Sequence, residues 1–120
     1  VLEAVPDFAV FSGSEDFLLD NRRAGGAGTI TAMANINAPM IADLYAKWEE
    51  PEAEDLQSQI SEIRAVIRDA GTIPALKAVL AHYREAPSLR TVRPPLLPMD
   101  EAAAGKLIGA LEEAGFTPSF

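Results

Sequence analysis

Two short apolar runs separated by a helix-like segment constrain the fold of this chain more than any other feature of its sequence. The first run covers residues 8–11 and breaks at Ser12-Gly13. A segment with helical spacing follows over about residues 14–24, and the second run covers residues 29–33. This order is that of a strand, a crossover helix and a second, parallel strand. Because both runs are nearly continuous in apolar or small residues, each strand is expected to need cover on both faces, as parallel strands in α/β proteins do.

A shortage of further strands is the second constraint. Two strands do not make a stable sheet by themselves, and the rest of the sequence offers no good third strand. Such a segment alone is expected to expose its strand edges at Ala9, Phe11, Thr29 and Thr31, and to aggregate or form oligomers unless these edges are covered. Residues 1–7 are interpreted as the tail of a preceding helix that leads into the first strand.

The segment between the two strands carries its own start and stop signals. Ser12 and Ser14 are rival N-caps for the helix, and Glu15 completes a capping box when Ser12 is the cap. Gly25 and Gly26 end the helix, since glycine readily adopts the positive φ angle that often follows a last turn.

From Asn35 onward the sequence predicts helices. Asn37 caps the first of these, which has Pro39 in its first turn. The second covers about residues 52–70 and ends at Gly71. Their expected apolar stripes are Ile41, Leu44, Tyr45 and Trp48 in the first helix and Leu56, Ile60, Ile63 and Ile67 in the second.

Two more helices are predicted on either side of a proline-rich loop. Pro74 opens one helix, and Asp100 caps the other, which ends at Gly115. The loop, residues 86–98, contains four prolines and is expected to be extended and irregular. The loop is expected to pack through Val92, Leu96 and Leu97 and to be held in place by Arg90 and Arg93. The apolar stripe of the helix before the loop is expected to be Leu76, Val79, Leu80 and Tyr83, and that of the helix after it Leu107, Ile108 and Leu111.

Composition excludes several classes of function. The 120 residues suffice for one domain with a modest core. The net charge of -8, from 18 acidic and 10 scattered basic residues, disfavours binding to a nucleic acid backbone. The absence of cysteine excludes a disulfide scaffold, a thiolate metal site and a cysteine nucleophile. No run approaches the length of a membrane span and residues 1–10 lack the basic leader of a signal peptide, so a soluble, cytoplasmic protein without membrane partners is expected.

Four segments, taken in order, give the sequence a family resemblance. They are residues 11–16 (FSGSED), residues 24–30 (AGGAGTI), the Ala34-Asn35 pair after the second run, and residues 92–96 (VRPPL) before the final helix. Together these segments resemble the C-terminal part of the dihydrodipicolinate synthase and N-acetylneuraminate lyase family.

The resemblance implies a fold, a chemistry and a set of partners. The fold is an α/β protein, a (β/α)8 TIM barrel, with residues 1–50 as its last two units (strands seven and eight) and residues 51–120 as a helical appendage. Taken alone, the chain is mostly helical. Members of the family bind pyruvate or another 2-keto acid as a Schiff base on a lysine, without a further cofactor, and add it to or release it from an aldehyde. The implied partners are therefore pyruvate or a similar keto acid, an aldehyde, the rest of the same barrel, and other subunits of a homo-oligomer, a tetramer in the parent family.

The same resemblance assigns residues to the substrate pocket. Gly13 matches the glycine whose carbonyl borders the substrate, and Ile30 matches the apolar residue beside the Schiff-base lysine. Glu15 and Asp16 stand where sugar-acid members hold substrate hydroxyls. The lysine itself is expected upstream of Val1, because the family has it about one β/α unit before the glycine. No catalytic residue and no metal ligand is therefore assigned to this chain.

Three functions from different classes remain open at this stage. The first is a pocket-wall segment of a pyruvate-dependent class I lyase or aldolase, inactive without the rest of its barrel. The second is a stand-alone acidic helical module that oligomerises through its exposed strand edges and has no catalytic activity. The third is a small enzyme that uses Glu15, Asp16 and a bound metal, for which two adjacent carboxylates supply too few ligands.

Overall fold

The predicted order of strands and helices is found in the structure, divided between two units. The computed structural model describes residues 3–5 and 7–120. The first unit is Val1–Ser61 and the second is Glu62–Phe120. In the part of the chain that the structure describes, no helix has both the length and the apolar character that a bilayer span requires.

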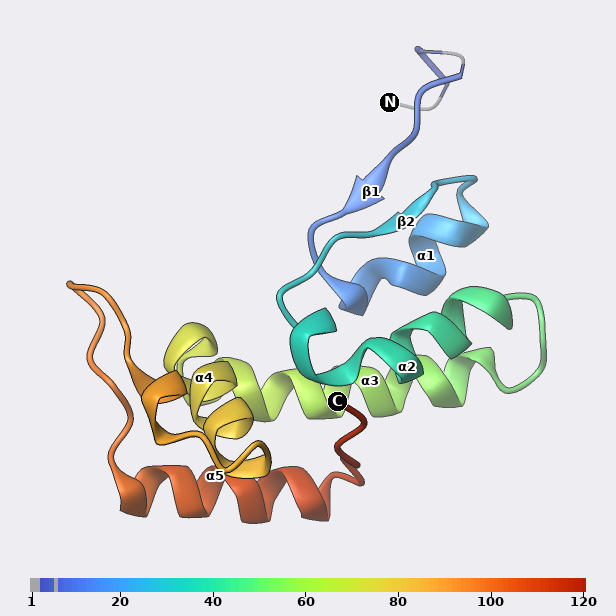
Figure 1. Ribbon diagram of the computed structural model, residues 1–120. Helices are drawn as coiled ribbons and strands as arrows, with labels where there is room; N and C mark the ends of the chain where they lie inside the picture. The colour runs from blue at the N-terminus through green and yellow to red at the C-terminus, as the bar shows by residue number, and fades with distance from the viewer. Residues whose placement is uncertain (1–2, 6) are drawn as a thin grey trace. The chain divides into compact units, whose positions relative to one another are not determined.

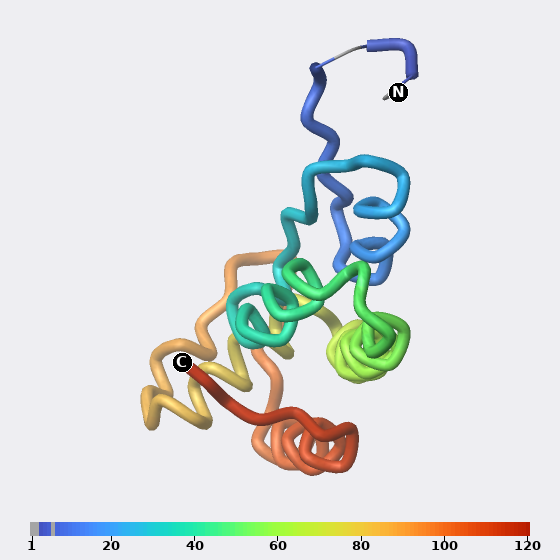
Figure 2. The backbone as a smooth tube through the Cα atoms, turned by 90° about the vertical axis from the view of Figure 1, so that its right-hand side faces the viewer, coloured from blue at the N-terminus to red at the C-terminus, as the bar shows by residue number. Residues whose placement is uncertain are grey.

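A strand, a helical segment and a parallel strand open the first unit (Figure 1). Strand β1 (Phe11–Ser12) pairs with β2 (Gly28–Thr29), with Phe11 opposite Gly28 and Ser12 opposite Thr29. A 3-10 turn, η1 (Glu15–Phe17), and helix α1 (Leu18–Arg23) connect the strands. Helix α1 lies alongside both strands, as Figure 2 also shows.

Both strands are shorter than the sequence predicts. The sequence predicts strands over residues 8–11 and 29–33, but the paired strands hold only two residues each. Two further backbone bonds extend the contact, from Ala27 N to the Val10 carbonyl at 2.8 Å and from Ile30 N to the Ser12 carbonyl at 3.0 Å. The ladder stays short because, among the described residues, each strand has one partner only, and an isolated pair of strands is weak.

Ser14, and not Ser12, caps the helical segment. The amide of Asp16 donates to the Ser14 hydroxyl at 3.2 Å. The Ser12 hydroxyl donates instead to the Ser14 carbonyl at 3.0 Å. The choice between the two rival caps is thus settled, and the capping box that pairs Ser12 with Glu15 is wrong.

The side chain of Asn21 holds the two strands together. Its Nδ2 donates to the Val10 carbonyl at 3.2 Å, and its Oδ1 accepts from the Gly28 amide at 3.0 Å. A Cβ atom at position 26 would overlap this side-chain amide, so the space that Asn21 occupies exists because Gly26 lacks one. We call this pair the Asn21–Gly26 bracket.

Helix α2 (Ala34–Ala46) starts four residues earlier than predicted, after Met33 as its N-cap in place of Asn37, and it bends at Asn37. Asn37 is buried and has a non-helical φ of -129°, after which the helix restarts with Pro39 in its first turn. Proline has no N–H to donate to the preceding turn, and this explains the break. The predicted helix start is therefore a kink within a longer helix. Helix α3 (Ala53–Asp69) follows close to its predicted bounds and crosses from the first unit into the second.

The apolar stripe of α2 only partly faces the core. Ile41 and Leu44 are buried as predicted, but Tyr45 is 44% exposed. The rings of Tyr45 and Trp48 instead face the guanidinium of Arg22, with Cζ 4.6 and 5.1 Å from the two ring centroids. Such cation–π contacts stabilise by about 0.5–1 kcal/mol at exposed sites. The predicted stripe is therefore confirmed for Ile41 and Leu44 but wrong for Trp48, which lies in a turn after the end of α2 at Ala46.

The second unit consists of the end of α3, two further helices and the proline-rich loop. These helices are α4 (Thr72–Tyr83) and α5 (Glu101–Glu113), with a short 3-10 helix, η2 (Pro87–Arg90), after α4. Gly71 and Gly115 have φ angles of 90° and 80°, as expected for the glycines predicted to end α3 and α5. The buried apolar side chains of this unit include Ile63, Ile67, Leu76, Val79, Leu107, Ile108, Leu111 and Phe116.

The proline-rich loop is anchored at its two ends. Asp100 caps α5 as predicted, with Oδ1 accepting from the Ala103 amide at 2.7 Å, and Arg90 lies 3.5 Å from the Glu101 carboxylate. The predicted packing of Leu97 is wrong, since this side chain is 80% exposed, whereas Leu96 is 38% exposed and partly covered. Neighbouring side chains in an extended segment point to opposite sides, so adjacent leucines cannot both face one helix.

The residues before β1 do not form the predicted helix tail. Residues 3–5 and 7 lie in turns and a bend, and Asp7 has a positive φ of 63°, which is incompatible with a right-handed helix. Val1, Leu2 and Pro6, which belong to the same prediction, lie outside the described residues.

The Asn21–Gly26 bracket generates a double-mutant prediction. Gly26→Ala forces a Cβ into the Asn21 amide and is expected to lower the free energy of unfolding by about 1–3 kcal/mol. In Asn21→Ala, Gly26→Ala the clash is absent, so the double variant should lose less than the sum of the two single losses. Urea denaturation of the four proteins measures this coupling. Gly105→Ala is the control, because a Cβ there meets nothing within 4 Å; additive losses would contradict the bracket.

Tyr83 generates a pH-dependence prediction for the second unit. Burial, and to a smaller extent the nearby Glu112 carboxylate, raises the pKa of Tyr83 above its ordinary value of 10.0. The unfolded chain therefore loses this proton first, and the stability that Tyr83 contributes is present below pH 10 and lost as the pH rises through the folded pKa. Denaturation at increasing alkaline pH, compared with Tyr83→Phe, should show a steeper loss in the parent protein. Equal losses in both proteins would contradict this expectation.

Candidate functional site

The carboxyl ends of the two parallel strands bring the predicted site residues to one place. The Ile30 amide donates to the Ser12 carbonyl at 3.0 Å, so Gly13 and Ile30 follow directly on paired residues. Parallel strands end at the same edge of their sheet, which is where barrel enzymes have their active sites. Two residues that lie 17 positions apart in the sequence therefore border the same region of space.

Gly13 is open, and its surroundings do not require glycine. A Cβ built at this position meets nothing within 4 Å, and the φ angle of Gly13 is not among the positive values. Gly26 and Gly28 differ, because a side chain at 26 would clash with Asn21, and Gly28 has a φ of 143° with its Cβ position 3.3 Å from the Tyr45 ring. The fold of this segment thus explains Gly26 and Gly28 but not Gly13.

Glu15 is completely buried in the first unit. The hydroxyl of Thr31, two residues past the end of β2, donates a short hydrogen bond to Glu15 Oε2 and accepts a bond from the Met33 amide at 3.1 Å. Glu15 therefore joins the segment after β1 to the segment after β2. This buried carboxylate therefore helps to fix the relative positions of the two strand ends.

Gln57, on α3, makes hydrogen bonds to the backbone of η1 and of α1. Its Nε2 donates to the backbone carbonyl of Glu15 at 3.0 Å, and its Oε1 accepts from the Leu19 amide at 3.1 Å. This residue was not predicted from the sequence. A single glutamine on an amphipathic helix gives no signal that distinguishes it from an ordinary surface residue.

Asp16 and Ile30 have more accessible side chains than Glu15. Asp16 is half-buried, and its Oδ2 accepts from the Ser14 hydroxyl at 3.3 Å. Ile30 is 72% exposed, so the described chain leaves most of the surface of this apolar residue uncovered. The region thus combines a backbone carbonyl at Gly13, a carboxylate and an apolar side chain.

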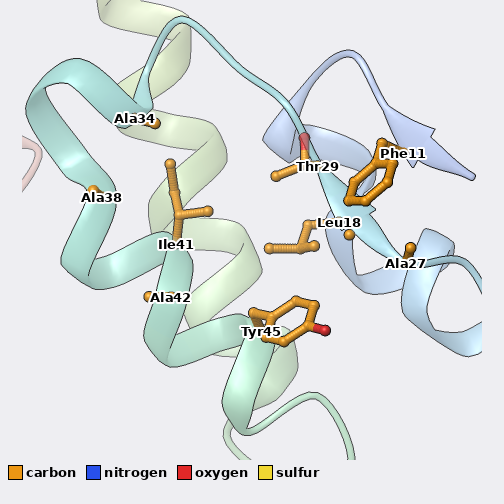
Figure 3. A pocket seen from close by; sticks show the side chains of 10 residues that line it. Phe11, Leu18, Ala27, Thr29, Ala34, Ala38, Ile41, Ala42 and Tyr45 are labelled. Atoms are coloured by element: carbon orange, nitrogen blue, oxygen red, sulfur yellow. The ribbon is translucent and has the colours of Figure 1, made fainter. Parts of the chain in front are cut away.

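A second feature, an apolar hollow of about 360 Å³, lies between the strands and α2 (Figure 3). Its walls include the rings of Phe11 and Tyr45 and the side chains of Leu18 and Ile41. No charged side chain lines it. The hollow can accommodate apolar groups, but it lacks the chemistry that a keto acid or an aldehyde would require.

The residues with metal-binding chemistry do not gather. Within residues 3–5 and 7–120 there is no group of three or more His, Cys, Asp or Glu side chains that could hold a metal ion. Glu15 is already bonded to Thr31, and Asp16 to Ser14. The described strand ends therefore present a half-buried carboxylate and an exposed apolar side chain, but no cluster of metal ligands.

Comparison with known proteins identifies the family of the chain. The model of the Dihydrodipicolinate synthetase family matches residues 1–114. The chain belongs to this family. The resemblance predicted from the segments at 11–16, 24–30 and 92–96 is thereby confirmed.

Curated members of the family are similar over most of this chain. A 4-hydroxy-tetrahydrodipicolinate synthase of Macrococcus caseolyticus is 34% identical over 85% of the chain. A protein of Emericella nidulans named probable 4-hydroxy-2-oxoglutarate aldolase, mitochondrial, is 34% identical over 95% of it. The chain spans 34% and 36% of the lengths of these two relatives.

Solved structures of the family share the fold of this chain. The 2-keto-3-deoxygluconate aldolase of Sulfolobus, in complex with D-KDPG, has a TM-score of 0.83 over 93% of this chain and 39% of its own, at 23% identity. The N-acetylneuraminate lyase of Fusobacterium nucleatum has a TM-score of 0.80 over 94% of this chain and 39% of its own, at 21% identity. At these identities the similarity concerns the fold alone.

The Glu15–Thr31 bond generates a prediction for the site of this family member. Thr31→Val removes the hydroxyl and leaves a buried carboxylate without this donor, which is expected to cost about 1–3 kcal/mol of unfolding free energy. Thr31→Ser keeps the hydroxyl and is expected to stay within about 1 kcal/mol of the parent protein. Chemical denaturation of both variants checks the difference. Equal stability of the valine and serine variants would show that the bond contributes nothing measurable.

Proposed function

We propose that this chain forms the last two β/α units and the C-terminal helices of a (β/α)8-barrel enzyme that binds pyruvate or another 2-keto acid as a Schiff base. In this proposal β1 and β2 are the seventh and eighth strands of the barrel, and the helices from about residue 51 onward are the appendage. The enzyme is a lyase or aldolase. The names of the family relatives, a synthase and two aldolases, support this reaction class, as does the structure of the Fusobacterium lyase complexed with pyruvate.

The observation that carries the proposal is the open glycine at the end of β1. Gly13 has neither a crowded Cβ position nor a positive φ angle, so the local fold does not account for its lack of a side chain. A glycine lets a ligand approach the backbone closely. We infer that the Gly13 carbonyl borders the bound keto acid, next to Ile30 across the strand pair.

The lysine that forms the Schiff base comes from the part of the enzyme that precedes this chain. The three lysines of this sequence are Lys47, Lys77 and Lys106, which lie at the end of α2, on α4 and on α5. None of these positions is the carboxyl end of a strand. In the assembled barrel, Ile30 packs beside the incoming lysine and excludes water from it, which lowers the pKa of a lysine and makes its amine nucleophilic.

The two carboxylates after Gly13 take part in different ways. Asp16, half-buried at the strand ends, is positioned to hold hydroxyls of the aldehyde-derived part of the substrate. Glu15, which stands beside it in the same predicted subsite, acts through Thr31 by fixing the geometry of the wall. The uncovered strand edges, the exposed Phe11 and the apolar hollow of Figure 3 are the surfaces that the rest of the barrel covers, and the barrel assembles as a homo-oligomer.

Trapping with borohydride tests the proposal. The whole protein that contains this chain is treated with pyruvate and sodium borohydride, and its peptides are mapped by mass spectrometry. One reduced pyruvyl adduct is expected, on a lysine that is none of Lys47, Lys77 and Lys106, because the nucleophile must lie at the end of a barrel strand. The 120-residue chain alone, treated in the same way, is expected to remain unmodified.

Two matched variants give the test a control. Gly13→Val places a branched side chain where the keto acid would lie and is expected to reduce adduct formation strongly, while Gly105→Ala, on α5, leaves it unchanged. An adduct on Lys47, Lys77 or Lys106 would overturn the assignment of the nucleophile. A whole protein that forms no adduct but oligomerises through this chain would instead favour a non-catalytic interaction module.

A further inference from the structure

A shallow groove lies in the second unit, between the start of α4 and the proline-rich loop. Its volume is about 420 Å³, and its walls are formed by Ile73, Lys77, Thr91, Val92, Arg93 and Leu96. The groove is therefore built from one helix and the loop segment that follows η2. All of its residues lie in the unit Glu62–Phe120, whereas the strand ends described above belong to Val1–Ser61.

Two cationic side chains, Lys77 and Arg93, line this groove. Several cationic side chains of the described residues form ion pairs: Arg23 with Glu54, Lys47 with Asp43, Arg68 with Asp69 and Arg90 with Glu101. Lys77 and Arg93, in contrast, have no ion pair, hydrogen bond or ring contact to any side chain in the described part of the chain. No carboxylate lines the groove. The net charge of the chain is -8, whereas this groove is lined by two positive charges and no negative one.

The rest of the groove is apolar and open to a ligand. Ile73 on α4 is 53% exposed, and Leu96 on the loop is 38% exposed. These side chains have apolar surface in water, and covering it with a hydrocarbon group is favourable. The Thr91 hydroxyl adds a neutral donor at the same wall.

We propose that this groove is a binding site for an organic anion with an apolar body, such as an aryl or alkyl carboxylate. The carboxylate pairs with Lys77 and Arg93, and the hydrocarbon part lies against Ile73 and Leu96. A small inorganic anion would use the charges but not the apolar walls, and a neutral apolar molecule would leave both cations uncompensated. The combination of charge and apolar surface selects a ligand that carries both.

The test uses the whole protein and a pair of probes that differ only in charge. The probes are 4-phenylbutyrate and its neutral amide, titrated while the isoleucine methyl signals are followed by NMR, with Ile73→Val to identify the Ile73 signal. We expect saturable binding of the carboxylate with a shift of the Ile73 methyl. Binding of the amide should be weaker by roughly fivefold, as expected for two partly screened ion pairs.

A charge variant and a matched control locate the site. Lys77→Gln, Arg93→Gln is expected to weaken 4-phenylbutyrate binding by roughly fivefold, whereas Lys106→Gln, which removes a lysine of α5 outside the groove, should leave it unchanged. Raising the salt concentration should reduce the difference between the probes. Equal binding of acid and amide, unchanged binding in the double variant, or inorganic phosphate binding as tightly as 4-phenylbutyrate would each overturn the proposal. Schiff-base trapping is expected to be normal in all of these variants, so the groove and the proposed enzyme activity can fail independently.

Discussion

The part of this structure that positions the candidate site depends on one side-chain amide. The strands β1 and β2 exchange too few backbone bonds to hold each other in register, since each is two residues long. Asn21 adds a bond to either strand, and Gly26 provides the room for it. Gly13 and Ile30 lie immediately beyond this short ladder, so their separation is set by the same bonds. Asn21, a helix residue, thus stabilises the register of the two strands, which in a larger sheet would be stabilised by further strands on either side.

The order of elements could be predicted from the sequence because its signals are local. Gly71 and Gly115 stop helices through their own φ angles, and Asp100 caps α5 through its own side chain, so neither signal depends on distant residues. Strand length depends on how many partners a strand has, which no local pattern reveals. The contacts of Arg22 with the rings of Tyr45 and Trp48 join α1 to α2 and to the turn that follows it, whereas helical spacing indicates only which residues of one helix share a face.

The candidate site shows the same division. Gly13, Glu15, Asp16 and Ile30 were assigned through the resemblance, and the structure brings the ends of their two segments together. The sequence could not distinguish the two carboxylates, which are neighbours in the chain and differ in burial because Glu15 lies under Thr31. Gln57 has no signal in the sequence, because its bonds are to the backbone of a distant segment, at Leu19 and Glu15.

The contact between Arg22 and Trp48 has a practical consequence. Trp48 is the sole tryptophan of the sequence, and its ring lies 5.1 Å from a guanidinium that α1 holds in place through a bond from Arg22 to the Gly26 carbonyl. Its fluorescence emission therefore depends on whether the strand–helix–strand segment and α2 are assembled, and the second unit has no indole to contribute. Tryptophan fluorescence can therefore follow the unfolding of the unit Val1–Ser61 separately from that of the unit Glu62–Phe120.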